Sequence, residues 1–195
     1  MRRLKLNEIS RCSVWPRRLL GLDKFPVQER SINKIEQEYN ADKFKKCLNL
    51  YHKHNGNKDP FELRFSIAKD SLNKEMSAVL EGELVLATQN ELLDQFFELL
   101  QDAISPLLEQ SNTVIELGAA FGTNLWMLSK VFKNVTFLGG DYSDNAVELA
   151  RLLYAKQSNI TVSKLNFYDD FYPAIEEAQE PVILFTSQAI EQLPS

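Results

Sequence analysis

The stretch VIELGAAFGTNLW, residues 114–126, decides the fold that the sequence predicts. Its first four residues are mostly apolar and predict a short buried strand, and a segment that is compatible with a helix begins near Thr123. Two glycines, Gly118 and Gly122, lie between the strand and the helix. The first allows a sharp turn after the strand, and the second would allow the backbone to approach a ligand closely at the start of the helix.

Short apolar runs alternate with helical segments on the C-terminal side of this stretch. We predict strands at residues 114–117, 135–138, 160–165 and 182–186, and helices at 123–132, 144–156 and 171–178. Parallel strands need crossover connections, and right-handed crossovers place helices over the sheet. The pattern therefore indicates an α/β fold with a Rossmann-like, doubly wound parallel sheet.

The N-terminal part of the chain predicts helices instead. One helix has apolar residues from Ile32 to Tyr51, and a second is expected over residues 66–80 approximately. The segment 13–22 is interpreted as a loop anchored by its tryptophan, and Thr88 with Glu91 forms the capping box of a further helix. We predict two domains: a helical N-terminal extension, residues 1–87, which could act as a lid, and an α/β core, residues 88–195.

Composition narrows the function classes. The 195 residues have a net charge of −5 and a pI of about 5.2, which argues against a protein that coats nucleic acid. Cys12 and Cys47 lie far apart and predict neither a disulfide framework nor a metal site. No apolar run reaches the length of a membrane span, so we expect a cytoplasmic protein with no membrane and no nucleic-acid partner.

A second motif is FLGGDYSDNAVELAR, residues 137–151, in which Asp141 follows a predicted strand. Asp141 lies 141 − 118 = 23 residues after the first glycine, about where a carboxylate accepts hydrogen bonds from both hydroxyls of a ribose. The alternative is that Asp141 only turns the chain while Ser143 or Asp144 caps the next helix. The combination with the glycine turn favours a nucleoside ligand.

The glycine loop does not fit two common phosphate-binding patterns. A dinucleotide fingerprint that starts at Gly118 needs a further glycine at position 120, where the sequence has Ala120, and Thr123 occupies its last position. A P-loop needs a lysine that this segment lacks. A nicotinamide-dependent oxidoreductase is therefore the less favoured function.

Residues 88–195 resemble class I S-adenosylmethionine-dependent methyltransferases. The similar segments are VIELGAAFGTN, GGDYSDNAVELAR, LNFYDDF and ILFTSQAIEQLP. The resemblance implies S-adenosylmethionine as the cofactor, with Asp141 on the ribose, Tyr142 beside the adenine, and Asn166 and Phe167 near the adenine amino group. It places Glu116 near the amino acid end of the cofactor. The other implied cofactor-binding residues are Gly118, Ala120, Gly122 and Ser187.

The prediction of the methyl acceptor rests on three other segments. The segments WPRRLLGL, KIEQEYNADKF and SQAIEQLP are similar to bacterial sugar O-methyltransferases, which implies a sugar or another small hydroxylated acceptor. An oxygen nucleophile needs a base, and Glu191 is the titratable candidate after the fourth strand; alternatively it is a surface residue. A methyltransferase-like module that binds a partner without catalysis is the competing hypothesis.

The predicted core is shorter than that of the family it resembles. The family sheet has the strand order 3-2-1-4-5-7-6, and the sequence predicts four strands, so we expect a C-terminally incomplete core. The fourth strand, residues 182–185, would then be an apolar sheet edge. We expect the chain to self-associate along this edge and to transfer no methyl group by itself.

Overall fold

A computed structural model describes residues 1–24, 31–66 and 74–193. The chain divides into two compact units, one formed by Met1–Gln28 with Ala68–Leu99 and the other by Glu29–Ile67 with Leu100–Ser195. These units are defined by compactness and not by function, so the predicted division into functional domains between residues 87 and 88 stays a prediction.

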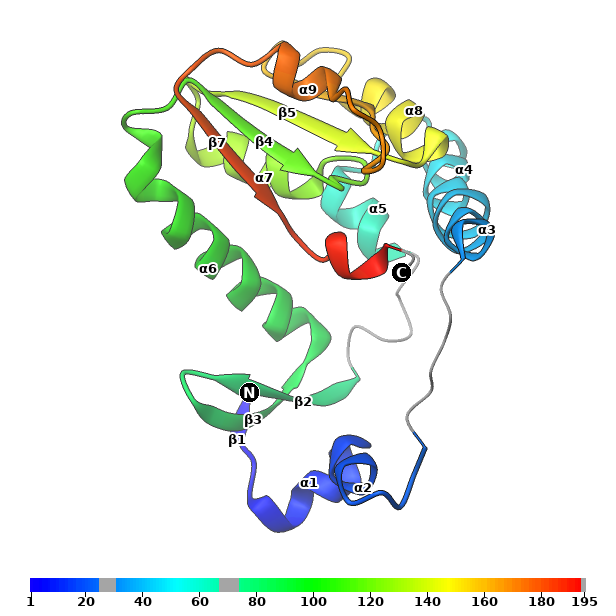
Figure 1. Cartoon of the computed structure of the whole chain (residues 1–195). Coiled ribbons are helices and arrows are strands. Elements are labelled where there is room, and N and C mark those ends of the chain that lie inside the picture. The colour runs from blue at the N-terminus through cyan, green and yellow to red at the C-terminus, as the bar shows by residue number, and fades with distance from the viewer. Residues whose placement is uncertain (25–30, 67–73, 194–195) are drawn as a thin grey trace. The chain divides into compact units, whose positions relative to one another are not determined.

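The second unit contains the predicted parallel sheet. Strands β4 (Thr113–Leu117), β5 (Thr136–Asp141), β6 (Ile160–Lys164) and β7 (Val182–Thr186) pair in the order β6-β5-β4-β7, and every pairing is parallel (Figure 1). In order of sequence this is 3-2-1-4, so the winding reverses between β4 and β7. Such a reversal opens a crevice at the carboxyl ends of the strands, where α/β proteins bind ligands.

Helices cover both faces of this sheet. On one face, α7 (Thr123–Val131) and α8 (Asp144–Leu153) pack on Val114 and Phe137; on the other, α9 (Pro173–Glu176) packs on Ile115. Adjacent strand residues point to opposite faces, so Val114 and Ile115 serve different layers. The doubly wound α/β prediction is confirmed, although α9 is shorter than the helix expected at 171–178.

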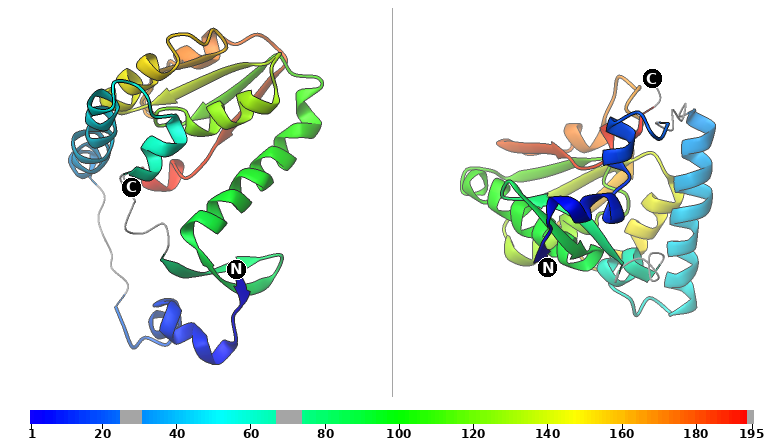
Figure 2. Two further views of the ribbon diagram at one scale, coloured as in Figure 1. Left: turned by 180° about the vertical axis from the view of Figure 1, so that it is seen from behind. Right: turned by 90° about the horizontal axis from the view of Figure 1, so that it is seen from below.

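A helical segment N-terminal to the sheet packs against α8 in the same unit (Figure 2). It consists of α3 (Ile32–Ile35), the π-helix η2 (Glu36–Phe44) and α4 (Lys45–Lys53), and α5 (Pro60–Ser66) follows. The predicted helix is thus confirmed, with a π-helical middle. Asn40 Oδ1 fastens η2 to the start of α8, because it accepts hydrogen bonds from Ser143 Oγ at 2.7 Å and Asn145 N at 2.9 Å.

The first unit corrects the prediction that residues 1–87 are helical. It has short helical elements, η1 (Leu6–Glu8), α1 (Ile9–Cys12) and α2 (Trp15–Leu19), and an antiparallel sheet of β1 (Arg2–Arg3), β2 (Glu75–Leu80) and β3 (Glu83–Thr88). The segment predicted as an anchored loop contains α2, and its Trp15 is 55% exposed. The capping box is confirmed: Glu91 N donates to Thr88 Oγ1 at 3.2 Å at the start of α6 (Gln89–Leu108).

The helix predicted over residues 66–80 is wrong for residues 75–80, and residues 67–73 lie outside the described part. Glu81 and Gly82 have positive φ values of 50° and 79°, and Leu80 pairs directly with Glu83. A two-residue turn of this kind joins antiparallel strands. The apolar spacing around Val79 was compatible with a helix, but the turn at Gly82 selects a hairpin.

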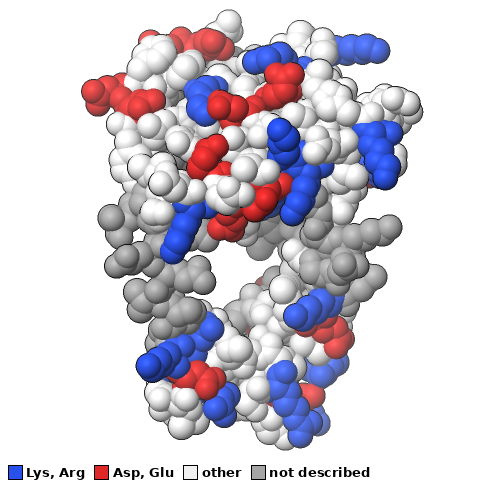
Figure 3. All heavy atoms as spheres, turned by 90° about the vertical axis from the view of Figure 1, so that its right-hand side faces the viewer, with Lys and Arg blue, Asp and Glu red and all other residues white. Residues whose placement is uncertain are grey.

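The face that carries α4 and α8 has charges of both signs. Figure 3 shows acidic and basic side chains interspersed on the face that carries α4 and α8, without a large patch of one sign. Among the helices of residues 1–24, 31–66 and 74–193, none is long and apolar enough to cross a membrane.

The buried side chain of Tyr154 holds the glycine loop against the core. Tyr154 is 5% exposed, and its hydroxyl donates to Phe121 O at 3.0 Å and Gly122 O at 2.9 Å. Tyr154→Phe leaves Phe121 O without this donor, so the free energy of unfolding should fall by about 1–2 kcal/mol. Urea unfolding measures it. Tyr51→Phe, which removes one longer bond of 3.3 Å to Leu152 O, is the control and should cost less; equal midpoints for Tyr154→Phe and wild type would contradict the account.

Candidate functional site

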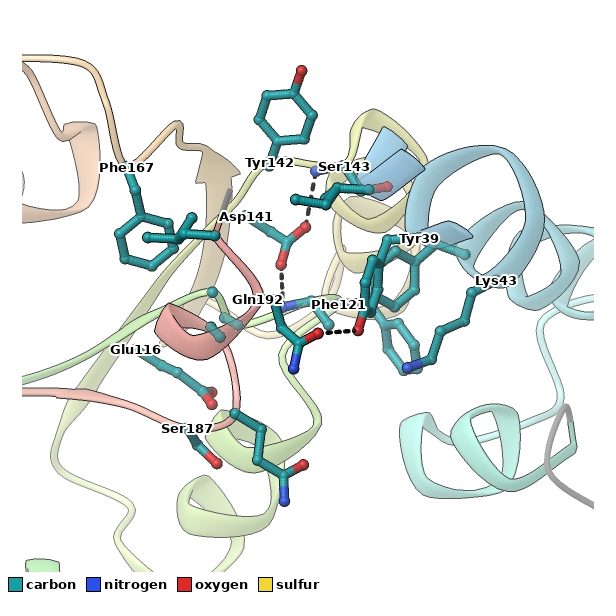
Figure 4. Close-up of a pocket in the computed structure, with 18 of the residues that line it drawn as sticks. Tyr39, Lys43, Glu116, Phe121, Asp141, Tyr142, Ser143, Phe167, Ser187 and Gln192 are labelled. Carbon is teal, nitrogen blue, oxygen red and sulfur yellow. Dashed lines mark hydrogen bonds between the residues drawn. The ribbon is translucent and has the colours of Figure 1, made fainter. Parts of the chain in front are cut away.

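A cavity of about 590 Å³ lies at the carboxyl ends of β4, β5 and β7 (Figure 4). Its walls come from the glycine loop after β4, the turns after β5 and β6 and the segment after β7, and η2 and α5 add further side chains. All of these elements belong to the second unit. The volume suits a ligand of nucleoside size. The crevice expected from the strand order is therefore present.

The glycine loop has one position that strictly needs glycine for the cavity. Gly118 has φ 79°, and a Cβ atom there would lie 2.2 Å from Ala189 Cβ in the segment after β7. Ala120 also has a positive φ, 52°, and lines the cavity. A side chain at Gly118 would therefore displace the segment after β7.

Gly122 packs against the core of the second unit. It has φ 77°, but a Cβ atom there would meet Val162 Cγ2 at 3.1 Å and Tyr154 Cε2 at 3.2 Å, which belong to the core. Gly122 is not among the cavity-lining residues. The backbone conformation and the core packing explain why a glycine occupies this position, and the expectation that Gly122 leaves room for a ligand stays a prediction.

Asp141 ends β5 and lies in the cavity wall with 9% of its surface exposed. Its Oδ2 accepts a hydrogen bond from Ala120 N at 2.7 Å, and its Oδ1 accepts one from Ser143 N at 2.8 Å (Figure 4). Burial raises the pKa of Asp141, and these two backbone donors oppose the rise. Ser143 caps α8 by accepting from Ala146 N at 3.2 Å, so the capping and cavity roles belong to different residues.

Glu116 lies deeper, in β4, and is 1% exposed. Burial raises its pKa to about 8, against the effects of a hydrogen bond from Asn124 Nδ2, 2.6 Å from Oε1, and of the Arg64 charge. Its other oxygen, Oε2, and Asn124 Oδ1 are buried and have no hydrogen-bond partner within the described part of the chain. Two buried polar atoms next to the cavity therefore have no hydrogen-bond partner in the described part of the chain.

The three residues expected around an adenine all line the cavity: Tyr142, Asn166 and Phe167. The side chain of Asn166 is engaged by its own loop, since Nδ2 donates to Asp169 Oδ1 at 2.9 Å and Oδ1 accepts from Tyr168 N at 3.2 Å. The Asn166 side chain is thus held by the turn after β6.

The segment after β7 closes the cavity on the side of η2. Ser187 and Glu191 line the cavity, and Glu191 is exposed. The Glu191 carboxylate accepts a hydrogen bond from Gln192 Nε2 at 3.0 Å, and Gln192 Oε1 accepts one from Tyr39 OH at 3.1 Å. The Tyr39 bond links η2 to the short helix η3 (Ile190–Gln192). Both sequence candidates are thus brought to the cavity.

Sequence reasoning missed several cavity residues. Tyr39, Lys43 and Arg64 come from the helical segment, more than 45 positions before the glycine loop, and no local motif marks them. Asn124 lies inside the stretch that decides the fold, where an Asn at the first turn of a helix gave no functional signal. Within residues 1–24, 31–66 and 74–193, no cluster of His, Cys, Asp or Glu side chains could hold a metal ion.

Solved structures of known proteins are similar to part of this chain. The chain matches no protein-family model and no curated protein. One similar solved structure is PKMT2 from Rickettsia typhi in complex with AdoHcy, which is 26% identical over 33% of this chain and 13% of that chain, with a TM-score of 0.29. Geranyl diphosphate methyltransferase in complex with GPP and sinefungin is 19% identical over 43% of this chain and 31% of that chain, with a TM-score of 0.36. The methyltransferase domain of bacterial CtHen1 is 22% identical over 38% of this chain and 42% of that chain, with a TM-score of 0.34. This chain spans less than half of each, and TM-scores below 0.5 establish no family for it.

The raised pKa of Glu116 makes stability depend on pH. The folded pKa of about 8 lies above the ordinary value of 4.5, so the folded state binds more protons between these values. Stability should therefore fall as the pH rises from about 5 to 8, with a contribution of up to about 1.4 kcal/mol per pH unit. Glu116→Gln should remove this component, whereas the exposed control Glu177→Gln should keep it. Parallel pH profiles of wild type and Glu116→Gln in urea unfolding would contradict the assignment.

Proposed function

We propose that the protein binds S-adenosylmethionine in this cavity and transfers its methyl group to a small hydroxylated acceptor. The unpartnered oxygens Glu116 Oε2 and Asn124 Oδ1 are the observation that carries the proposal. An ammonium group has three donors, and an amino acid ammonium placed beside these oxygens would satisfy both. Arg64, whose charge acts on Glu116, would receive the carboxylate of the same amino acid group.

The other cavity residues fit the remaining parts of this cofactor. An ionised carboxylate offers about four lone-pair sites, and Asp141 uses two of them for backbone donors, which leaves two for ribose hydroxyls. Tyr142 and Phe167 would contact the adenine, with Asn166 beside them, and Ala120 and Ser187 would complete the cavity around the cofactor. The roles of these residues are part of the proposal.

The bound cofactor would supply an electrophilic methyl group. The chain would contribute mainly by position, because an in-line displacement needs the acceptor oxygen and the methyl carbon aligned and water excluded. Glu191, on the cavity wall after β7, is the proposed base that accepts the proton of the acceptor hydroxyl. The sugar acceptor and the cytoplasmic location remain predictions.

The oxidoreductase is the competing function that Glu116 and Asn124 distinguish from the proposal. A nicotinamide dinucleotide also has a ribose for Asp141, but it has no ammonium group to satisfy Glu116 and Asn124. A binding module without catalysis would hold the cofactor in the same way and show no turnover with any acceptor. Cofactor binding therefore tests the oxidoreductase alternative, whereas turnover by this chain would contradict both the binding module and the expectation that the chain transfers no methyl group by itself.

Self-association through β7 also remains a proposal. Val182 and Leu184 are 37% and 52% exposed, and in the described part of the chain β7 pairs with β4 along one edge only. An apolar edge with free backbone groups can pair with another copy. Sedimentation of the wild type against Leu184→Lys tests this: a monomeric wild type contradicts it, and a concentration-dependent dimer that Leu184→Lys weakens supports it.

Calorimetric binding of S-adenosylhomocysteine and of NAD to the purified chain tests the cofactor. S-adenosylhomocysteine should bind and NAD should not. Asp141→Ala should weaken binding by about 2–4 kcal/mol, since two charge-assisted hydrogen bonds to the ribose are lost. Circular dichroism controls for folding, and Asp170→Ala at an exposed position outside the cavity lining is the matched variant. Unchanged affinity in folded Asp141→Ala, or preferential NAD binding, would contradict the proposal.

A further inference from the structure

Two basic side chains face the cavity without a counter-ion. Lys43 comes from the π-helix η2 and Arg64 from α5. Neither forms an ion pair or a side-chain hydrogen bond among the described residues. Two positive charges at one cavity favour the binding of an anionic ligand group.

Lys43 lies on the side of the cavity where η2 meets the glycine loop (Figure 4). Its ammonium contacts the ring of Tyr39, 5.0 Å from the centroid, and that of Phe44, 5.7 Å away. Although Lys43 is an exposed residue, the surrounding protein lowers the pKa of its ammonium, and Arg64 lowers it further. A bound anion would favour the charged form of the Lys43 ammonium and so raise its pKa again.

The cofactor proposed above leaves Lys43 uncompensated. Its carboxylate would face Arg64 and its ammonium would face Glu116, so the charges of the amino acid end balance one another. Glu38 and Asp141 act on Lys43 from a distance, and neither forms an ion pair with it in the described part of the chain. Both oxygens of Asp141 already accept hydrogen bonds from backbone donors. The charge that remains for a second ligand is therefore the positive charge of Lys43.

The backbone that carries Lys43 is held in place. Besides the bonds from Ser143 and Asn145 N, Asn40 Oδ1 accepts from Asn145 Nδ2 at 2.9 Å, and Asn40 O accepts from the same nitrogen at 3.0 Å. Phe44 packs edge-on against Phe121 of the glycine loop, with ring centroids 6.0 Å apart. π-Helical segments are frequent at functional sites. Hydrogen bonds of Asn40 and the packing of Phe44 therefore hold the helix that carries Lys43.

We propose that Lys43 binds a carboxylate or phosphate group of the acceptor, so that the substrate is an acidic small molecule. This inference rests on the proposed function for the placement of the cofactor. It names Lys43 as a residue that determines specificity, and it narrows a hydroxylated acceptor to one that also carries a negative charge.

The test measures anion binding directly. The protein is saturated with S-adenosylhomocysteine, and inorganic phosphate or acetate is titrated in by calorimetry. Lys43→Met should weaken binding of the preferred anion at least about tenfold, and Lys43→Arg, which keeps the charge, should stay within about threefold of wild type. Lys46→Met, at an exposed position of α4 outside this cavity, should have no effect. Glucose, glucuronate and glucose 6-phosphate then distinguish a carboxylate from a phosphate, since only the matching charged sugar should gain affinity over glucose.

The outcomes separate this inference from the proposed function. If S-adenosylhomocysteine does not bind, the proposed function fails, and the anion titrations of the free protein still report on Lys43. Absence of saturable anion binding to the wild type, or equal binding to wild type and Lys43→Met, overturns the inference. It is also overturned if Arg64→Met abolishes anion binding while Lys43→Met preserves it, because the anion site would then belong to Arg64.

Discussion

The Asp141 carboxylate is the interaction on which the arrangement of the site depends. By accepting hydrogen bonds from Ala120 N and Ser143 N, it joins the glycine loop after β4 to the turn after β5. Ser143 in turn donates to Asn40, which fastens the π-helix to the same turn. One buried carboxylate thereby connects the loop, the sheet and the helical segment that together form the cavity, and a buried charge can hold them because both of its oxygens have donors.

Some polar groups of the cavity have hydrogen-bond partners in the protein, and others have none among the described residues. Asp141 has donors from the protein, whereas Glu116 Oε2 and Asn124 Oδ1 have none among the described residues. Lys43 and Arg64 line the same cavity and form no ion pair within residues 1–24, 31–66 and 74–193. Folding tolerates such groups where a ligand completes them, since an unmet buried hydrogen bond costs about 1–3 kcal/mol. The unpartnered groups are the reason why we propose a ligand with both an ammonium and an anionic group.

The fold could be predicted because its signals are local. Apolar runs, the glycine turn and the Thr88 capping box each lie within a few residues, and the parallel order follows from their alternation. The hairpin of β2 and β3 was missed because its apolar spacing also fits a helix. Lys43 and Arg64 could not be predicted, since only the packing of η2 and α5 brings them to the strand ends. The packing of Gly122 against Val162 and Tyr154 could not be predicted, because the sequence does not show which side of the loop faces the core.

The central claim is that the Glu116 carboxylate receives the ammonium group of the cofactor. Free Glu116, with its pKa raised to about 8, is mostly protonated at pH 7, and an ammonium beside it would favour the charged form. Calorimetric binding of S-adenosylhomocysteine at pH 7, in buffers with different enthalpies of ionisation, measures the protons exchanged. The account predicts release of close to one proton by the wild type and none by Glu116→Gln. Equal proton release by the two proteins, or none by the wild type, would contradict it.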